Sequence, residues 1–263
     1  MGGTGKTPVC DYLARELIDR KPILVLRGYR RQEKTPLPLL VSDGQIRRAS
    51  AAEAGDEAFW LARRKGATVI VDSKRSRAIK THTRPGSLII LDDAFQNPLV
   101  YADFALVLLD ASLEPAAFRT FPAGRFREDA RALGRADAVL LTRTDQAPPD
   151  FLSYWDSLAT AAALPVFRAR QTLRLPSIPD DARVGAFCGL GHPEAFFRLI
   201  EESGQSLVRR LTFPDHHPYR AREIAEFIGS ADLWLTTEKD AVRLPEIVGR
   251  ERIFVASMEI SLD

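Results

Sequence analysis

The 263-residue sequence is poor in cysteine, in net charge and in long apolar runs, and each shortage excludes a class of protein. Cys10 and Cys188 lie far apart without a CxxC or Cys/His cluster, which argues against a disulfide framework or structural zinc and favours a reducing compartment. A net charge of +2 is too small for bulk nucleic-acid binding. No apolar run approaches the ~20 residues that span a bilayer, and no signal-peptide pattern opens the chain, so we expect no membrane crossing.

What remains is the composition of an ordinary globular protein, with 45% hydrophobic and 27% charged residues and a length typical of one to two domains. The charge is uneven along the chain. Between Arg63 and Arg84 the basic residues face a single acid, Asp72. This basic run indicates either a solvated helix face or a positive surface for phosphorylated ligands or anionic lipid headgroups.

Short apolar runs alternate with helical patterns, which is the βαβ rhythm of a parallel α/β sheet. We expect a P-loop NTPase-like parallel sheet flanked by helices over residues 1–165, a linker strand over 166–180, and a smaller α/β domain over 181–263. The last strand, 253–260, could return to the linker strand and make it two-stranded. The strands expected in the first domain, apolar throughout as if covered on both faces, are 23–26, 68–71, 88–91, 105–109 and 138–141. Its expected helices are 8–19, 53–65, 74–82 and 151–163.

The most informative residues open the chain: Gly2, Gly3, Thr4, Gly5, Lys6 and Thr7 precede a helical pattern. Glycines let backbone N–H groups turn onto phosphate oxygens, Lys6 can reach the β- and γ-phosphates, and Thr7 can ligate Mg²⁺. The pattern predicts a P-loop for ATP; the competing interpretation is a Gly-rich turn that merely precedes a helix. Because a P-loop normally follows a buried strand, we expect such a strand upstream of Met1.

A second nucleotide signal is the apolar run 88–91, which ends in Asp92 and Asp93. Carboxylates at the end of a strand beside a P-loop are where Mg²⁺ is held, directly or through water. Successive strand side chains face opposite ways, so the two acids should do different jobs, and either could be the metal partner. Alone, an Asp in this place is also common in surface turns. The TRTD sequence at 142–145 resembles a guanine-reading TKxD only faintly, because Arg143 stands where Lys is needed.

Further polar clusters sit beside Gly or Pro at 55–57 (GDE), 121–128 (FPAGRFRE) and 213–219 (FPDHHPY). Each has a plain structural interpretation: a helix N-cap for Asp56, a loop for the second cluster, and surface histidines for the third. Taken singly, each is more typical of structure than of catalysis.

Together and in order, the clusters resemble the tetraacyldisaccharide 4'-kinases of lipid A biosynthesis, and the resemblance covers essentially the whole chain. The segments that carry it are GGTGKTP (2–8), RGYRR (27–31), GDE (55–57), DDAFQ (92–96), FPAGRFRE (121–128), FCGLGHPEAFF (187–197), FPDHHPY (213–219) and TTEKDAVRL (236–244).

The resemblance implies transfer of the γ-phosphate of ATP to the 4'-hydroxyl of an acylated disaccharide 1-phosphate, giving lipid IVA, with Mg²⁺, in two α/β/α domains joined by a two-stranded linker. It implies peripheral association with the cytoplasmic face of the inner membrane, no nucleic acid and no obligate protein partner. Asp56 and His216 would together activate the hydroxyl, with Asp215 positioning them. Other residues fall on the family's active-site positions: Lys6, Arg127 and Glu128 on charged elements, Gln96 and Tyr29 near nucleotide or substrate.

The sequence departs from the family pattern at Arg30, Ala94 and Arg125, where Gly, Gly and Pro are usual. None of these replaces a residue with a chemical role. The alternative function is a switch-type P-loop ATPase of the partitioning or delivery class. Such proteins carry a signature Lys where Met1 stands here, and they have no use for GDE or PDHHPY.

Overall fold

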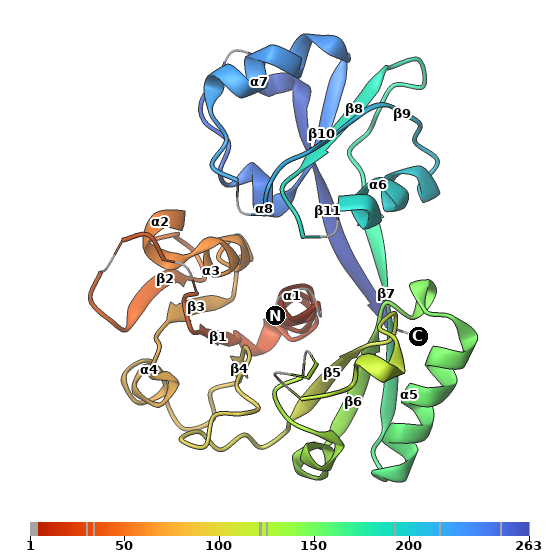
Figure 1. Ribbon diagram of the computed structural model, residues 1–263. Helices are drawn as coiled ribbons and strands as arrows, with labels where there is room; N and C mark the ends of the chain where they lie inside the picture. Colours follow the sequence, from red (N-terminus) through yellow and green to blue (C-terminus); the bar gives the residue numbers. More distant parts are fainter. Residues whose placement is uncertain are drawn as a thin grey trace. The chain divides into compact units, whose positions relative to one another are not determined.

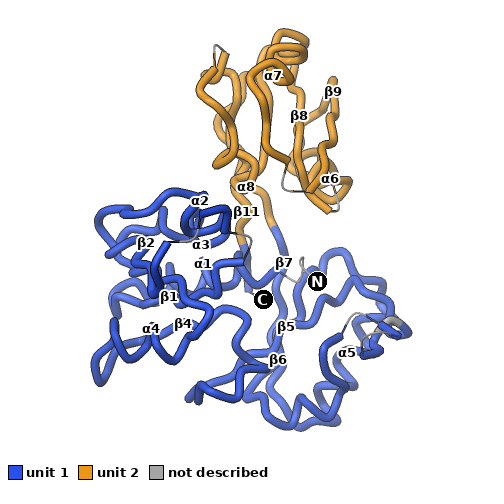
Figure 2. Tube along the Cα trace, turned by 60° about the vertical axis from the view of Figure 1, so that its left-hand side comes forward, with its two compact units in different colours: residues 1–171, 260–263 blue, residues 172–259 orange. Residues whose placement is uncertain are grey.

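The structure, a computed structural model, describes residues 5–29, 31–33, 35–120, 123–124, 126–191, 193–215, 217–247 and 249–262. The chain forms two compact units, residues 1–171 with 260–263 and residues 172–259 (Figure 2). The strands β7 (Val166–Arg174) and β11 (Ile253–Leu262) are neighbours in the strand order, and each contributes residues to both units.

The first sheet of unit 1 has the order β2-β3-β1-β4 (Figure 1). The strands β1 (Ile23–Leu26), β3 (Thr68–Val71) and β4 (Ile89–Leu91) run parallel, as the apolar runs predict. The strand β2 (Leu39–Asp43), which the sequence patterns did not predict, pairs antiparallel with β3. The sheet is therefore mixed rather than purely parallel, while the predicted α/β class is confirmed.

The helices beside this sheet begin with α1 (Lys6–Glu16), which is followed by a 3-10 turn at Ile18–Arg20. The single helix expected over 53–65 is wrong: the structure has α2 (Ala51–Ala54) and α3 (Asp56–Leu61) with a break at Gly55. Gly55 has φ 84° and ψ 151°, a conformation outside the helical region that separates the two helices. The helix α4 (Arg75–His82) follows β3 as predicted.

The remaining strands of unit 1 are β5 (Leu106–Asp110) and β6 (Ala138–Thr142), which pair in parallel, β6 also pairing with β7. The helix α5 (Pro149–Ala161) starts with proline at its first position, where a missing N–H costs nothing, and buries Trp155. Short 3-10 turns span Pro115–Ala117, Ala130–Arg135 and Thr144–Gln146.

Burial differs between these strands. All of β6 is buried, whereas β4 and the first part of β5 are only half-buried, so the expectation that every strand is covered on both faces is wrong for these two. Each of them has a single hydrogen-bonded neighbour in the sheet order, which makes it an edge strand. The helices α1 and α3 pack on the first sheet through side chains such as Ala14, Leu24 and Leu61, whose burial contributes about 1.5–3 kcal/mol for each large aliphatic group.

Unit 2 is a smaller parallel sheet in the order β11-β10-β8-β9. Its elements are β8 (Val184–Cys188), α6 (Pro193–Glu202), β9 (Leu207–Thr212), α7 (Ala221–Phe227) with a 3-10 turn at Ile228–Ser230, β10 (Leu233–Thr237), α8 (Glu238–Ala241), and a 3-10 turn at Arg250–Arg252 before β11. The chain leaves β8 toward β9 and returns to β10 on the other side of β8. The carboxyl ends of β8 and β10 therefore form the switch point where open α/β sheets bind ligands.

Over the part of the chain that the structure describes, none of the helices combines the length and the hydropathy that a membrane span requires.

Candidate functional site

The predicted P-loop is described from Gly5 onward, while Gly2, Gly3 and Thr4 lie outside the described residues. Gly5 is the N-cap of α1 with φ 81° and ψ 14°, a left-handed conformation that glycine adopts without strain. Lys6 and Thr7 occupy the first turn of α1, so their side chains lie at the positive end of the helix dipole. The left-handed backbone at Gly5 and the positive charge of Lys6 at the start of the helix are thus features of an anion-binding turn.

Asp93 joins this turn to a second segment. It follows β4 with φ 52°, and its Oδ1 lies 3.7 Å from Lys6 Nζ. Its Oδ2 accepts a hydrogen bond from Arg127 Nη1 at 3.0 Å. The unusual backbone is stabilised by Arg75, whose Nη2 donates to the carbonyl oxygens of Asp92 at 2.7 Å and of Asp93 at 2.9 Å. A lysine, an aspartate and an arginine from three distant segments therefore meet at one place.

The contacts continue from Arg127 to further predicted residues. Gln96 Oε1 accepts from Arg127 Nη1 at 3.4 Å, and Gln96 Nε2 donates to Glu128 Oε2 at 3.2 Å. Glu128 is held in turn by Arg135 Nη2, at 2.9 and 2.7 Å from its two carboxylate oxygens. The predicted residues Lys6, Asp93, Gln96, Arg127 and Glu128 thus form one connected network.

Asp92 has different surroundings. Cys10 Sγ lies 3.9 Å from Asp92 Oδ1. Burial, followed by the negative charge of Glu57, raises the pKa of Asp92 to about 6, against the opposing effect of Lys6. Burial and the charge of Asp92 likewise raise the pKa of the Cys10 thiol. The GDE segment therefore brings a second carboxylate next to the strand end that carries Asp92.

The GDE segment is fixed by backbone packing against the RGYRR segment. A Cβ at Gly55 would lie 2.8 Å from the carbonyl oxygen of Tyr29, so only glycine fits there. Arg31 Nε donates to the carbonyl oxygen of Glu53, on the preceding helix. The side chain of Tyr29 is 69% exposed, and its predicted contact with nucleotide or substrate stays a prediction. Asp56, half-buried, opens α3 directly after this contact.

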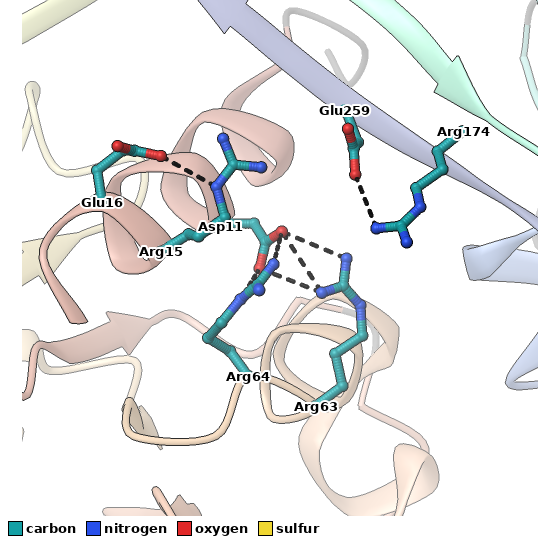
Figure 3. A network of polar contacts seen from close by, with 7 residues as sticks. All are labelled: Asp11, Arg15, Glu16, Arg63, Arg64, Arg174 and Glu259. Atoms are coloured by element: carbon teal, nitrogen blue, oxygen red, sulfur yellow. Dashed lines mark hydrogen bonds and ion pairs between the residues drawn. The ribbon is translucent and has the colours of Figure 1, made fainter.

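A buried carboxylate ties α3 to the P-loop helix (Figure 3). Asp11, on α1, accepts hydrogen bonds from Arg63 Nη1 at 3.2 Å and from Arg64 Nη2 at 2.6 Å, both just beyond the end of α3. The guanidinium of Arg63 also stacks 4.0 Å from the centroid of Trp60. The helix that carries Asp56 and Glu57 is therefore anchored directly to the helix that carries Lys6 and Thr7.

These contacts also bear on the basic run 63–84. Arg63 and Arg64 bind Asp11, Arg75 is buried, and Arg77 Nε lies 2.7 Å from Asp72 Oδ2. The run is consequently not one uniform charged face. Its exposed cations are Lys65, Lys74, Lys80 and Arg84, together with Arg77, which is paired with Asp72.

Unit 2 holds the remaining candidates. Asp215 is exposed in the segment between Phe213 and Tyr219, and His216 lies outside the described residues. His217 is half-buried, stacks on Phe213 at 4.9 Å between ring centroids, and places Nε2 3.1 Å from Glu223 Oε2. The second histidine of the pair is thus held by α7. The joint role of Asp56 and His216 stays a prediction.

Comparison with known proteins identifies the family. The family model for LpxK, tetraacyldisaccharide-1-P 4'-kinase, matches residues 1–263. The chain belongs to the tetraacyldisaccharide 4'-kinase family.

Individual family members show the same likeness. The tetraacyldisaccharide 4'-kinase of Halothermothrix orenii is 34% identical over 99% of this chain and 78% of its own length. That of Paramagnetospirillum magneticum is 36% identical over 100% of this chain and 79% of its own length. Among solved structures, LpxK from Aquifex aeolicus in complex with ATP superposes with a TM-score of 0.78 at 28% identity, covering 100% of this chain and 81% of that one. The predicted family and the P-loop kinase fold are confirmed.

Three residues of the candidate site were not predicted from the sequence patterns. In the sequence Arg75 is one residue of the basic run 63–84, although in the structure it donates to the carbonyl oxygens of Asp92 and Asp93. The GDE pattern gives no separate role to Glu57, although its negative charge acts on Asp92. Arg135, which binds Glu128, had no motif around it. Nor did a sequence signal mark Arg75, because its helix, RSRAIKTH, is mostly polar and an arginine there is expected to face solvent.

Proposed function

We propose that this chain transfers the γ-phosphate of ATP to the 4'-hydroxyl of an acylated glucosamine disaccharide 1-phosphate, which produces lipid IVA. The observation that carries the proposal is the joining of Lys6, Asp93 and Arg127 at the start of α1, in a chain that matches the 4'-kinase family over its whole length. No contact among the described residues favours the switch-type ATPase.

The network supplies what phosphoryl transfer needs. Negative charge spreads over the transferred group, so cations fixed beforehand stabilise the transition state. Lys6 and Arg127 are both held by one carboxylate, Asp93, and so are positioned without ligand. The N-terminus of α1 adds backbone N–H donors. As the new P–O bond to the sugar oxygen forms, the bond between the γ-phosphorus and the oxygen of ADP breaks, and these groups stabilise the charge on the transferred phosphoryl group and on the β-phosphate of the departing ADP.

Mg²⁺ fits the acidic side of this site. Asp92 is a half-buried carboxylate whose pKa is raised to about 6 by burial and then by the negative charge of Glu57, and a divalent cation bound there would stabilise its charged form. Thr7 and Asp92 would hold the ion, because Asp93 is already bound to Lys6 and Arg127. When bound, Mg²⁺ neutralises β- and γ-phosphate oxygens. No cluster of three or more His, Cys, Asp or Glu side chains able to hold a metal occurs in the described chain, which suits an ion held mostly by phosphate and water.

The acceptor hydroxyl must lose its proton, and we assign that role to Asp56 with His216, positioned by Asp215. Asp56 stands at the start of α3, beside Glu57 and anchored to α1 through Asp11. Asp215 stands exposed at the turn of the 213–219 segment. General-base assistance of this kind contributes roughly 10²–10⁴-fold.

Peripheral association with the cytoplasmic face of the inner membrane follows from the substrate class. Large apolar side chains are exposed directly after the DDAFQ segment: Leu99 at 77%, Tyr101 at 89% and Phe104 at 61%. Aromatic and aliphatic side chains in such positions suit acyl chains and the membrane interface. The proposal includes no nucleic acid and no obligate protein partner.

The test is ATP-dependent transfer of labelled phosphate to the disaccharide 1-phosphate by the purified chain, with Lys6→Ala and Asp56→Ala beside Lys65→Ala, an exposed lysine, as control. Turnover should fall by at least ~10²-fold in the first two variants and stay unchanged in the third. Chelation should abolish turnover and added Mg²⁺ restore it. Unchanged turnover in both Lys6→Ala and Asp56→Ala would contradict the proposal.

A further inference from the structure

Asp240 is a fully buried carboxylate in unit 2 that the proposed chemistry does not use. It lies on α8, where its backbone N–H donates to Thr237 Oγ1 at 3.1 Å. Its Oδ2 accepts from the Thr237 hydroxyl at 2.6 Å and from the backbone N–H of Gly189 at 3.1 Å. Arg243 Nη1 lies 3.5 Å from Oδ1. A buried charge is tolerated only with partners of this kind, so the carboxylate is a built feature of the fold.

Tyr219 faces the same carboxylate and is 5% exposed. Burial and the negative charge of Asp240 raise the pKa of the Tyr219 hydroxyl well above its ordinary value. A Cβ built on Gly189 would lie 2.8 Å from the Pro214 carbonyl oxygen, 3.1 Å from Asp240 Oδ1 and 3.3 Å from Tyr219 Oη. Three polar oxygens therefore converge over one glycine, at the carboxyl end of β8.

Phe213 and Tyr219 are the two ends of the segment that contains Asp215 and His216. Their rings meet edge-on with centroids 5.1 Å apart, and Tyr219 also packs edge-on against Phe187 at 5.5 Å and His217 at 5.0 Å. The backbone N–H of His217 donates to the Pro214 carbonyl at 3.0 Å. Both ends of the segment are thus held in the core, while Asp215 at its turn remains exposed.

The cluster of Gly189, Tyr219 and Asp240 also brings together three sequence motifs that the proposed chemistry does not connect. Gly189 comes from FCGLGHPEAFF, Tyr219 from FPDHHPY and Asp240 from TTEKDAVRL. These motifs are separated along the chain, and they meet at Asp240, at the switch point between β8 and β10.

We propose that Asp240 is a positioning residue for phosphoryl transfer: through the hydroxyl of Tyr219 it sets the conformation of the Phe213–Tyr219 segment, and so the direction in which Asp215 and its neighbours approach the acceptor hydroxyl. The inference rests on the proposed function. It makes Tyr219 the link between a buried charge and the proton-accepting segment. A displacement of that segment by a fraction of an ångström would slow the reaction without weakening nucleotide binding, because the P-loop belongs to unit 1.

The test uses Tyr219→Phe, which removes the hydroxyl but keeps the ring, and Asp240→Asn, which keeps the shape but removes the charge. Each should lower kcat on the disaccharide acceptor by on the order of 10-fold, with the KM for ATP unchanged, and should shift the pH profile of kcat. The double variant should be no slower than the slower single variant, because both changes break one linkage. The exposed pair Tyr154→Phe and Asp181→Asn are matched controls that should keep wild-type kinetics.

The outcomes separate the inference from the proposed function. If the unaltered chain does not phosphorylate the disaccharide, the proposed function fails. If it does, but Tyr219→Phe retains the wild-type kcat and pH profile, Asp240 serves stability alone and the inference is overturned. Should Asp240→Asn not fold, the kinetics of Tyr219→Phe decide the matter, measured on protein whose thermal unfolding matches that of the unaltered chain.

Discussion

Asp92 and Asp93 are adjacent in the chain and both half-buried, yet Asp93 lies 3.7 Å from Lys6 Nζ and 3.0 Å from Arg127 Nη1, whereas the negative charge of Glu57 acts on Asp92. Burial opposes the charge of Asp93, but Lys6 and Arg127 outweigh it and lower its pKa. For Asp92, burial and Glu57 act together and raise the pKa to about 6. Two neighbouring aspartates thus contribute to stability with opposite dependence on pH.

Asp92→Asn should stabilise the ligand-free chain at neutral pH. The pKa of Asp92 rises from 3.8 to about 6 on folding, so the folded state binds more protons than the unfolded state between these values, and the free energy of unfolding falls as the pH rises through this window. Asparagine carries no charge, so the variant does not lose stability in this window. Relative to the unaltered chain, its free energy of unfolding should be higher by at most roughly 3 kcal/mol above pH 7, and the difference should vanish near pH 4. Thermal unfolding at pH 4.5 and 7.5, without nucleotide or Mg²⁺, measures it.

Asp93→Asn is the matched control and should act with the opposite sign. Because the pKa of Asp93 is lowered on folding, its carboxylate stabilises the folded chain at pH values above the ordinary aspartate pKa. This stabilisation is lost as the pH falls through the pKa of the folded state. The amide should therefore destabilise at pH 7.5. Asparagine tolerates the left-handed backbone of this position, φ 52°, so the change reports charge. Equal effects of the two variants at both pH values would contradict the assignment.

Gly55→Ala should destabilise the chain and abolish activity, whereas Gly86→Ala should cost only backbone strain. Both glycines have similar φ, 84° and 86°, but a Cβ at Gly55 meets the Tyr29 carbonyl oxygen at 2.8 Å and one at Gly86 meets nothing within 4 Å. Strain alone costs about 1–2 kcal/mol, and the clash adds to it at Gly55. Chemical denaturation of the two variants gives the loss in free energy of unfolding for each, and the difference between them reports the clash with the Tyr29 carbonyl oxygen. An equal loss in both variants would show that this clash is unimportant.

Elements that depend on local sequence were predicted, whereas elements that depend on contacts between distant segments were not. Apolar runs such as 23–26, 68–71 and 138–141 predicted β1, β3 and β6, because buried parallel strands need unbroken apolar sequence. The strand β2 was not predicted because it is half-buried in part and its apolar run is interrupted by Ser42 and Asp43. The break at Gly55 escaped because its cause, the carbonyl oxygen of Tyr29, is far away in the sequence.

In the candidate site, too, the residues within recognisable motifs were predicted and their partners outside the motifs were not. Motifs with fixed chemistry, such as GKT and DD, identified Lys6 and Asp93, and the structure places them together. Partners outside motifs could not be predicted, because an arginine looks alike in sequence whether it binds Asp11, holds the carbonyl oxygens of Asp92 and Asp93, or faces solvent. Only the fold decides among these environments.

Arg75→Met should lower both stability and turnover, while Lys80→Met on the same helix should lower neither. Arg75 is 6% exposed and donates to two carbonyl oxygens, of Asp92 and Asp93, at 2.7 and 2.9 Å. Losing two charge-assisted hydrogen bonds in a buried place costs about 2–4 kcal/mol. It also frees the turn that presents Asp93 to Lys6, so kcat should fall more than the KM for ATP rises. Retained kcat in a folded Arg75→Met protein would show that the turn holds its shape unaided.

Asp11→Asn and Glu16→Gln make the same chemical change on one helix in different surroundings (Figure 3). Asp11 is buried and holds Arg63 and Arg64, whereas Glu16 forms an exposed pair with Arg15 at 3.0 Å. Removing the charge of Asp11 leaves two guanidinium groups with a weaker partner, at a cost of about 2–4 kcal/mol, against at most ~0.5 kcal/mol for Glu16. Because Asp11 anchors the helix of Asp56 to that of Lys6, Asp11→Asn should also lower kcat at temperatures where the variant is fully folded. Calorimetry combined with kinetics tests both effects, and a stable, fully active Asp11→Asn protein would show that α1 and α3 are held together by apolar packing alone.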